Sequence, residues 1–486
     1  MTKPGLREPS ENLVHVDEQE AISASAVRTP SVRWGLAGLS LSMLLSSLGT
    51  SIANVGLPNL ARAFDASFGQ VQWIVLAYLL AITTLIVSVG RLSDIAGRRR
   101  LFLIGIVLFT AASLLCGVAP TLSLLIAARV VQGLGAAIMM ALSMAFVGET
   151  VPKEKTGSAM GLLGTMSAIG TALGPSLGGV LISRLGWPAI FFVNVPLGCL
   201  ALLLARRYLP VDRRAASADL GGFDKLGTLL LVLTLAAYAL AMTIGRGHFS
   251  WLNIALLLAA AVGLGLFVVA ETKATSPLIR LTMFRDAVLS TGLVLNAMVS
   301  TVMMATLVVG PFYLSLGLGL NEAAIGAVMS VGPMISALSA VLAGRMVDRW
   351  SASFIVVVGL MLMVAGSPAL ALIPALFGIA GYIAAVAVLS PGYQLFQAAN
   401  NTAVMVDVSA SERGVVSGML NLARNLGLIT GAAAMGAVFS FATASIDITT
   451  ARAEAVANGM RVTFAVAAVL MMVAIAVAVV SRVRAR

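Results

Sequence analysis

Two stretches of the sequence share one glycine pattern at a fixed displacement. Residues 157–179 read GSAMGLLGTMSAIGTALGPSLGG, and residues 414–436 read GVVSGMLNLARNLGLITGAAAMG. Five glycines of the first stretch have a counterpart 257 residues further on, namely Gly157, Gly161, Gly170, Gly174 and Gly179. A pattern that recurs in this way indicates two related structural units.

The composition around both stretches predicts an all-α integral membrane protein. Of the 486 residues, 59% are hydrophobic and 10% are charged, whereas a soluble domain carries roughly 25% charged residues. A mean hydropathy of +1.01 over this length points to lipid as the main solvent. The short alternating segments of a membrane β-barrel are not found in the sequence, so the spans are expected to be helices.

Fourteen apolar runs of span length follow a polar segment, residues 1–32, which we predict to be a disordered cytoplasmic tail. The glycine repeat falls in the fifth and thirteenth runs. We therefore predict two six-helix bundles, residues 33–208 and 287–486, related by a parallel pseudo-twofold repeat, with two inserted linker helices within 209–286. The predicted spans are 34–56, 73–92, 101–119, 122–146, 158–182, 189–205, 225–244, 252–270, 288–316, 323–344, 353–375, 377–399, 414–440 and 462–481.

The basic residues test this count, because an error of one span would invert every later loop. With the N-terminus inside, 24 of the 31 lysines and arginines lie on the cytoplasmic side and five outside. This asymmetry predicts a multi-pass protein of the plasma membrane, the inner membrane of a bacterium, with both termini cytoplasmic. It also explains the net charge of +11 without a nucleic-acid partner. The tryptophans fall at predicted span ends, as an interfacial belt requires: Trp34, Trp73, Trp187, Trp251 and Trp350.

A stripe of small residues marks the fifth predicted span. Gly170, Gly174 and Gly178 recur every four residues, so a neighbouring helix can approach closely along one face. Pro175 beside them removes a helix hydrogen bond and permits bending. The stripe fits a hinge between the bundles, and static helix packing is the alternative.

Five segments of the chain carry recognisable motifs: GRLSDIAGRRR at 90–100, RVVQGLGAA at 129–137, GTALGPSLGG at 170–179, FFVNVPLG at 191–198 and SPLIRLTMFR at 276–285. Together they resemble the major facilitator superfamily, and within it the fourteen-span drug:proton antiporter family. The resemblance covers essentially everything after the tail, and it implies a transporter that works by rocking of two bundles.

The segment 90–100 is predicted to form the loop between spans two and three and to latch one conformation. Gly90 and Gly97 suit tight turns, while Asp94 can pair with arginines such as Arg98 or with a helix N-terminus. Asp348 is the counterpart of Asp94 after the tenth span. A solvated loop that only sets topology is the alternative.

Two arginines lie inside predicted spans. An arginine near the bilayer centre costs at least about 2.5 kcal/mol, so each should face protein or water and have a partner. For Arg129 the resemblance implies a role in proton coupling, and the alternative is a structural arginine bonded to backbone carbonyls or to Gln132. Arg424, close to Asn421, is expected to line the C-terminal half of the cavity.

The remaining polar residues within spans predict a mostly apolar cavity with few polar anchors, among them Asn54, Gln394 and Gln397. No carboxylate is expected at mid-membrane. In the first span, Gly49 occupies the position at which members of the family that this sequence resembles often carry an aspartate. Because a buried acid both takes up protons and attracts cationic drugs, its absence puts both roles in question.

These features predict a secondary active exporter of hydrophobic or amphipathic small molecules, driven by protons and working as a monomer in lipid. A facilitator or exporter of organic anions or lipid-like molecules is the alternative, because the only charges within spans are positive. A non-transporting sensor or a membrane enzyme is the remote alternative. The sequence offers no convergent catalytic set, so we expect no enzyme, no metal site and no cofactor.

Overall fold

The computed structural model describes residues 29–86, 88–150, 156–210, 224–244, 250–274, 281–406, 408, 413–444 and 451–485. These residues form helices and short turns, with no strand among them. The first helices are α2 (Thr29–Val55), α3 (Leu57–Ala63), α4 (Phe68–Ile86), α5 (Val89–Ala96), α6 (Arg98–Gly117), α7 (Leu122–Thr150), α8 (Thr156–Leu185), α9 (Ala189–Phe192) and α10 (Asn194–Tyr208). The later ones are α11 (Lys225–Thr243), α12 (Trp251–Lys273), η3 (Leu281–Arg285), α13 (Ala287–Phe312), η4 (Tyr313–Gly317), α14 (Glu322–Arg349), α15 (Ala352–Met405), α16 (Arg413–Thr430), η5 (Gly431–Met435), α17 (Gly436–Thr443) and α18 (Ala453–Ala485).

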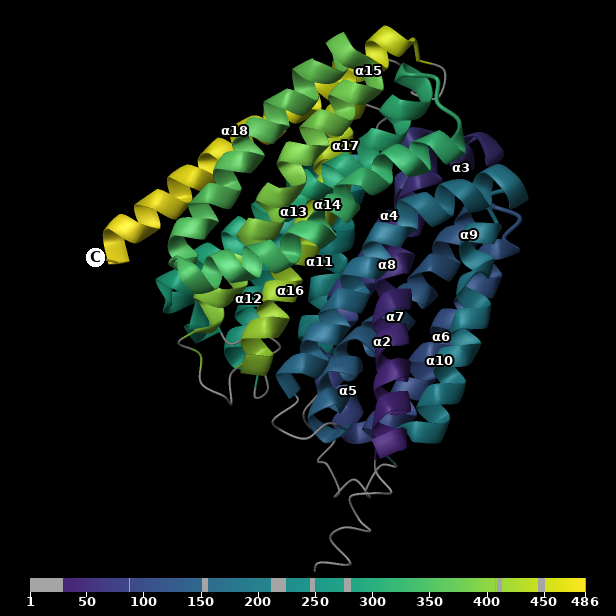
Figure 1. Ribbon diagram of the computed structural model, residues 1–486, viewed down its shortest axis with the longest axis vertical. Helices are drawn as coiled ribbons and strands as arrows, with labels where there is room; N and C mark the ends of the chain where they lie inside the picture. The colour runs from purple at the N-terminus through teal and green to yellow at the C-terminus, as the bar shows by residue number, and fades with distance from the viewer. Residues whose placement is uncertain are drawn as a thin grey trace, which may run out of the picture.

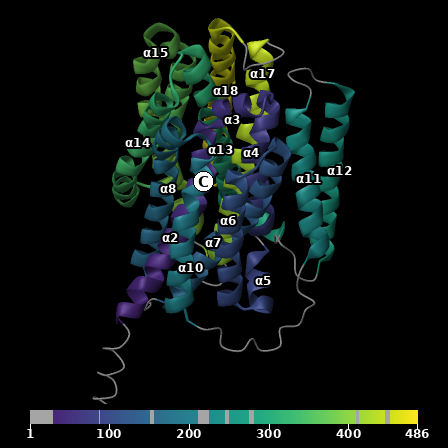
Figure 2. The ribbon, with the colours of Figure 1, turned by 90° about the vertical axis from the view of Figure 1, so that its right-hand side faces the viewer.

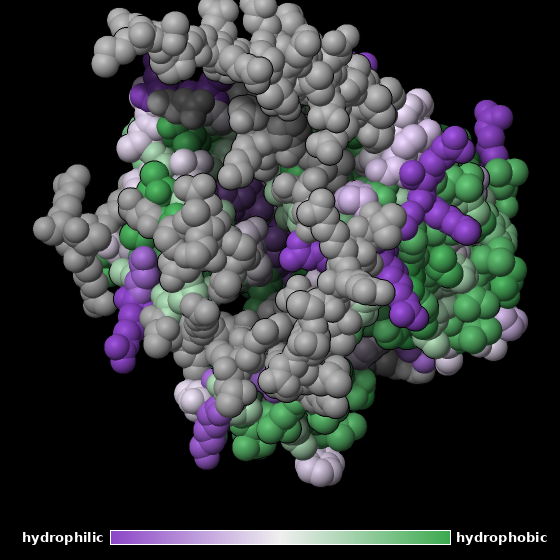
Figure 3. Space-filling view, turned by 90° about the horizontal axis from the view of Figure 1, so that it is seen from below, coloured by the Kyte–Doolittle hydropathy of each residue, from purple (hydrophilic) through white to green (hydrophobic). Residues whose placement is uncertain are grey.

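Thirteen helical stretches of the described chain are long and apolar enough to cross a membrane. Large apolar side chains cover the sides of the molecule, as Figure 3 shows from one end. On α12, for instance, Leu258 and Val262 are each 62% exposed. Such a surface is stable only against lipid, so the prediction of a multi-pass helical membrane protein is confirmed.

The longest helix, α15, turns back on itself. A straight helix of its 54 residues would extend roughly 80 Å, far more than a bilayer. At Gly378 the backbone takes φ 53° and ψ −128°, a conformation that favours glycine. The two arms then pack antiparallel, with Gly359 against Phe396 and Gly366 against Leu389. The turn lies two residues beyond residue 376, which separates the predicted spans eleven and twelve.

The helices up to α10 pack mainly with one another, and those from α13 onward do the same (Figure 1). Within the first set α2 lies along α8 and α7 along α4 and α6; within the second, α13 lies along α16 and α15 along α14 and α18. The main junction between the sets is formed by α8 and α14. The pair α11 and α12 stands at one side of the molecule (Figure 2).

The glycine repeat makes the same kind of close approach in both sets. In the first, a side chain at Gly170 would meet the backbone of Leu44 on α2. In the second, a side chain at Gly427 would meet the backbone of Ala297 on α13, and one at Gly431 that of Thr301. Glycine is therefore required at these positions by close contact, since a Cβ atom would collide with the neighbouring helix.

Several helices extend beyond the apolar runs that predict them. Helix α2 begins at Thr29, inside the segment predicted as a tail, and residues 1–28 lie outside the described part. Helix α4 begins at Phe68 and α18 at Ala453, five and nine residues before the predicted spans. Hydropathy marks only the part of a helix that lipid surrounds, whereas the backbone hydrogen bonds continue into polar turns outside it.

Candidate functional site

A cavity of about 610 Å³ lies between the two sets of helices. Helices α2 and α8 form one wall, and α13, α14, α15 and α16 form the opposite one, with smaller contributions from α4 and α7. This volume lies within the usual range of small-molecule sites, about 300 to 1,000 Å³. The arrangement makes a chamber for one bulky ligand that contacts both sets of helices at once.

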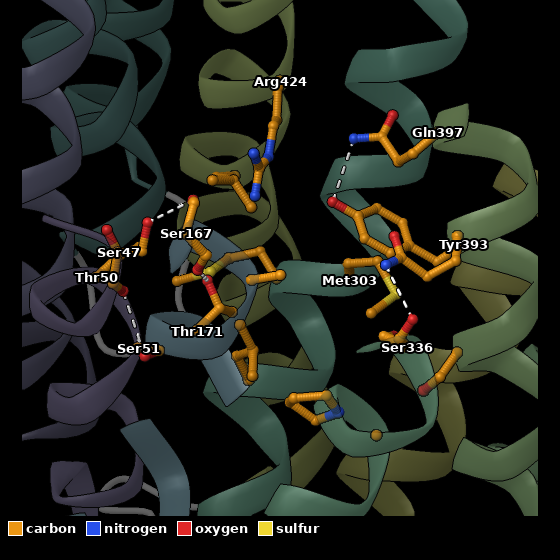
Figure 4. Close-up of a pocket in the computed structure, with 18 of the residues that line it drawn as sticks. Ser47, Thr50, Ser51, Ser167, Thr171, Met303, Ser336, Tyr393, Gln397 and Arg424 are labelled. Atoms are coloured by element: carbon orange, nitrogen blue, oxygen red, sulfur yellow. Dashed lines mark hydrogen bonds between the residues drawn. The ribbon is translucent and has the colours of Figure 1, made fainter. Parts of the chain in front are cut away.

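The wall from α2 and α8 carries small hydroxyl groups (Figure 4). The hydroxyls of Ser47 and Ser167 lie 2.6 Å apart, and Ser51 donates to the carbonyl of Gly170 at 3.3 Å. These bonds connect the two helices where the glycine stripe brings them together. Their hydroxyls are thus already paired within the protein, and this wall presents a largely neutral surface to a ligand.

The opposite wall carries amides, aromatic rings, methionines and a cation. Gln394 donates to the carbonyl of Ser336 at 3.0 Å, and Gln397 donates to the hydroxyl of Tyr393 at 3.2 Å. Arg424 reaches into the cavity from α16 (Figure 4). Its Nε atom is shielded from solvent and has no hydrogen-bond partner in the described part of the chain. Of the predicted cavity residues, Gln394, Gln397, Asn421 and Arg424 line this chamber.

One end of the interface between the two sets is sealed, and we call it the Arg62 end. The ring of Phe68 packs against those of Phe312 and Phe439, with centroids 4.7 and 5.4 Å apart. Buried Gln72 donates to the carbonyl of Ala432 at 2.9 Å. Arg62 forms an ion pair of 3.0 Å with Glu322.

Backbone contact completes this seal. A side chain at Gly179 on α8 would collide with Gly326 on α14, and one at Gly326 would collide with the carbonyl of Pro175. Asn59 also donates to Glu322 at 3.2 Å. Aromatic, polar and backbone contacts therefore close the Arg62 end together.

The other end, where α2 begins, is the Thr29 end, and it has open space beside glycines of three helices. A side chain at Gly164 on α8, at Gly344 on α14 or at Gly418 on α16 would meet nothing within 4 Å. Gly164 also lines the cavity. The molecule is thus closed at one end of its cavity and separated at the other.

Arg129 occupies a different place from Arg424. It is fully buried and donates to the carbonyls of Ile74 at 2.8 Å and Gly49 at 3.1 Å. Its third partner is Gln132 at 2.6 Å, and its guanidinium lies 4.0 Å from the ring centroid of Tyr78. The protein itself therefore satisfies this cation, through partners on α2, α4 and α7.

Neither Arg129 nor its partner Gln132 lines the cavity, and the same holds for Asn54. Gln132 donates onward to Ser113 at 2.7 Å, and Asn54 donates to the carbonyl of Thr50 at 3.0 Å. Asn54 was predicted to line the chamber, and it does not, because its amide is turned to the backbone of its own helix. The role of Arg129 in proton coupling stays a prediction. The geometry agrees with the alternative weighed for Arg129, a cation bonded to carbonyls and Gln132.

Comparison with known proteins identifies the family. The model of the Major Facilitator Superfamily matches residues 39–432. The chain is 30% identical over 403 residues to the riboflavin transporter RibZ of Clostridioides difficile (strain 630), covering 82% of this chain and 86% of that one. It is 32% identical over 416 residues to the multidrug resistance protein Stp of Mycobacterium tuberculosis (strain CDC 1551 / Oshkosh), covering 83% and 74%.

The chain belongs to the Major Facilitator Superfamily. A solved structure of a bacterial homologue of the human lysosomal transporter Spinster shares the fold, with a TM-score of 0.68 at 15% identity and coverage of 93% and 97%. This superfamily member is therefore a transporter, as its relatives are, and the sequence resemblance is confirmed. The similarity to the solved structure concerns the fold alone.

The loop motif of this superfamily member is described only in part. Gly97 connects α5 and α6 with φ +86°, so glycine is favoured there, and Arg98 begins α6. Gly90 lies inside α5, so the prediction of a tight turn at that residue is wrong. The side chains of Asp94 and Asp348 lie outside the described part of the structure, and their predicted latch stays a prediction.

The hinge residues predicted in the fifth span all lie on α8. Gly170 and Gly174 face α2, and Gly178 also faces α2, at Val55 and Ile52. The carbonyl of Pro175 faces Gly326 of α14. The stripe thus serves packing within the first set, while Pro175 and Gly179 meet the second. Whether the stripe also bends during transport stays a prediction.

Sequence reasoning missed the residues that close the Arg62 end. Gln72 and Phe68 precede the predicted second span, and Glu322 precedes the tenth. One signal was present: Glu322 is an isolated acid at the start of an apolar run, opposite one of the few basic residues of the outer side, Arg62. Their meeting across 260 positions depends on how the two sets pack, and spacing along the chain does not reveal it.

Proposed function

We propose that this transporter is a secondary active exporter of bulky hydrophobic or amphipathic molecules, working by alternating access. In this proposal it crosses the membrane fourteen times, because α15 supplies two crossings around Gly378. The spans form six-helix bundles within 33–208 and 287–486, and α11 and α12 are the inserted pair within 209–286. The matching glycine contacts of α8 with α2 and of α16 with α13 support this repeat.

The proposed orientation places the Thr29 end and both termini in the cytoplasm of the cell. The concentration of lysines and arginines in the loops of that side supports it. The relatives named above are bacterial, which favours the inner membrane. The cavity would then open toward the cytoplasm in this structure, ready to load cargo for export. We propose that the unit is a monomer surrounded by lipid.

The observation that carries the proposal is the cavity itself. Its lining combines methionines, such as Met303 and Met329, with hydroxyl and amide groups and a single charged side chain. Methionine adapts to ligands of different shape, which suits varied cargo more than one small polar solute. The names of the relatives, a multidrug resistance protein and a riboflavin transporter, support bulky cargo of this kind.

Proton coupling is the proposed energy source, and it rests on the resemblance of the segment around Arg129 to the antiporter family. Everted membrane vesicles provide the test. Cargo uptake should collapse when nigericin removes the pH gradient, and vesicles from cells without the chain serve as the control. Uptake that continues unchanged after nigericin would remove the proton from the proposal and leave the exporter.

A second candidate, export of organic anions, is favoured by one observation: Arg424 is the only charged side chain among the described residues of the cavity lining. A negative-inside potential drives one negative charge outward with about 2.3 kcal/mol per 100 mV, so no proton-binding carboxylate is needed. In the same vesicles anion uptake should survive nigericin and stop when valinomycin with potassium removes the potential. Uptake that ignores the potential would exclude this candidate.

A further inference from the structure

We infer that the cavity is a two-part site for singly charged amphipathic anions, in which Arg424 binds the acidic head and the methionine-rich region nearer the Arg62 end holds the apolar body. The inference rests on the proposed transport function and specifies its cargo.

The head region is a single face of α16. Asn421, Arg424, Asn425 and Leu428 are spaced three and four residues apart, and all four line the cavity. They place a guanidinium between two amides on one turn. A carboxylate, sulfonate or phenolate can accept hydrogen bonds from all three side chains, and charge-assisted bonds of this kind are the stronger ones.

The charge of Arg424 is available to a ligand in the cavity. The protein satisfies Arg129 with two carbonyls, an amide and a ring, but Arg424 Nε has no hydrogen-bond partner among the described residues. No described carboxylate lines the cavity to neutralise it. An anionic ligand in contact with the guanidinium would supply the missing negative charge.

The apolar region lies deeper along the same wall. Helices α16 and α13 run parallel, because Gly427 faces Ala297 and Gly431 faces Thr301 and Met304. Arg424 precedes Gly431 by seven residues, which is about 10 Å along the helix axis at 1.5 Å per residue. Figure 4 shows Arg424 and Met303 at separate levels of the cavity.

This separation fixes the direction in which cargo binds. With the Thr29 end open, a ligand would enter with its apolar body first and leave its acidic head at Arg424, nearer the opening. The body would lie against Met303 and Leu307 of α13, and Met329 of α14. A distance of about 10 Å between the two regions suits a fused aromatic system or a short lipid-like chain that bears one acidic group.

Three ligands with one ring system test the charge preference: 1-pyrenesulfonate, neutral 1-pyrenemethanol and cationic 1-pyrenemethylammonium. Binding is measured by isothermal titration calorimetry on the full chain in lipid nanodiscs, with empty nanodiscs as the blank and no ion gradient. The sulfonate should bind most tightly. Arg424→Gln should weaken its binding on the order of 10- to 100-fold, and leave the alcohol within about twofold.

Three further variants distinguish a loss of the charged site from a folding defect caused by the change at Arg424. Asn421→Asp keeps the arginine but places a carboxylate one turn away, so sulfonate binding should fall and ammonium binding should rise. Met303→Gln should weaken sulfonate and alcohol alike, because both share the apolar body. Arg461→Gln removes an exposed arginine of α18 that does not line the cavity, and it should change nothing.

Equal affinity for the three ligands, or an equal loss of sulfonate and alcohol binding in Arg424→Gln, would overturn the inference. Because binding is measured without transport, its outcome is independent of the proposed export. A protein that binds the sulfonate selectively but moves no cargo in vesicles would refute the function and keep the site. A protein that exports neutral dyes and binds the three ligands equally would refute the anion site and keep the proposed export function.

Discussion

The two ends of the helix interface differ in what holds them. At the Arg62 end, Gly179 and Gly326 bring the backbones of α8 and α14 into contact, and Gln72 donates to the carbonyl of Ala432. At the Thr29 end, Gly164 of α8 and Gly344 of α14 have open space around them. The backbones of these two helices therefore touch at the Arg62 end, whereas these glycines near the Thr29 end have open space beside them.

The closed state depends on contacts between the two sets of helices more than on contacts within each set. Contacts within each set, such as Gly170 against Leu44, are unaffected if the sets rock as rigid bodies. Contacts between the sets, at Gln72 and at the pair Arg62–Glu322, must break whenever the Arg62 end opens. Substitutions of the first kind should therefore change folding, and those of the second kind should change the balance between conformations.

The largest effect is expected from Gly170→Ala. The added methyl group would meet the backbone of Leu44, so α8 and α2 must move apart, at a cost of about 1 to 3 kcal/mol. Gly164→Ala, six residues earlier on the same helix, is the matched control, because its methyl group would enter open space. Thermal unfolding in detergent should show a lower Tm for Gly170→Ala alone. Equal Tm values for the two variants would contradict the tight packing of α2 on α8.

An intermediate effect is expected from Gln72→Leu. The change removes a buried hydrogen bond between the two sets, so the closed Arg62 end loses about 1 to 2 kcal/mol. A cysteine at Thr50, in a chain whose Cys116 and Cys199 are replaced by serine, reports opening through its reaction with an impermeant maleimide added outside the cell.

The labelling rate of that cysteine should rise about 10-fold in Gln72→Leu. Gln70→Leu on the same helix is the control, because Gln70 is exposed and bonds only to nearby Ser67. A similar rise in both variants would mean that the bond from Gln72 does not hold this end closed.

The smallest effect is expected at the ion pair. Arg62 is 57% exposed, and exposed pairs contribute about 0.2 to 1 kcal/mol, so Arg62→Ala should raise the labelling rate less than about fivefold. A double-mutant cycle with Glu322→Ala measures the coupling, which high salt should reduce. A coupling above about 2 kcal/mol would show that the pair, and not the buried contacts, controls this end.

Features that depend on one helix and its solvent could be predicted from the sequence. Lipid exposure produces apolar runs, so the long apolar helices could be predicted. Close helix contact requires small residues, so a packing role of Gly170 could be predicted as well. The sequence also indicated the reversal of α15, because an apolar run of that length is too long for a single crossing of the bilayer. Helix ends were less predictable, since α18 continues through polar turns to Ala453.

Features that depend on rotation and on contacts between sets could not be predicted in the same way. Arg129 and Arg424 both read as arginines inside spans, yet one is enclosed by carbonyls and the other lines the cavity. Which of the two faces the cavity depends on how each helix is rotated about its axis, and composition does not determine that rotation. The contact made by Gln72 could not be predicted either, because its partner, Ala432, is 360 positions away in the sequence.

The central claim is that the two ends open in alternation, and paired spin labels test it most directly. One pair replaces Arg62 and Glu322, and the other replaces Gly164 and Gly344, with distances measured by pulsed electron resonance in nanodiscs. In the Gln72→Leu background the account predicts a new population in which the first distance is longer and the second is shorter. Lengthening of the first distance with the second unchanged, in a protein that still transports, would contradict it.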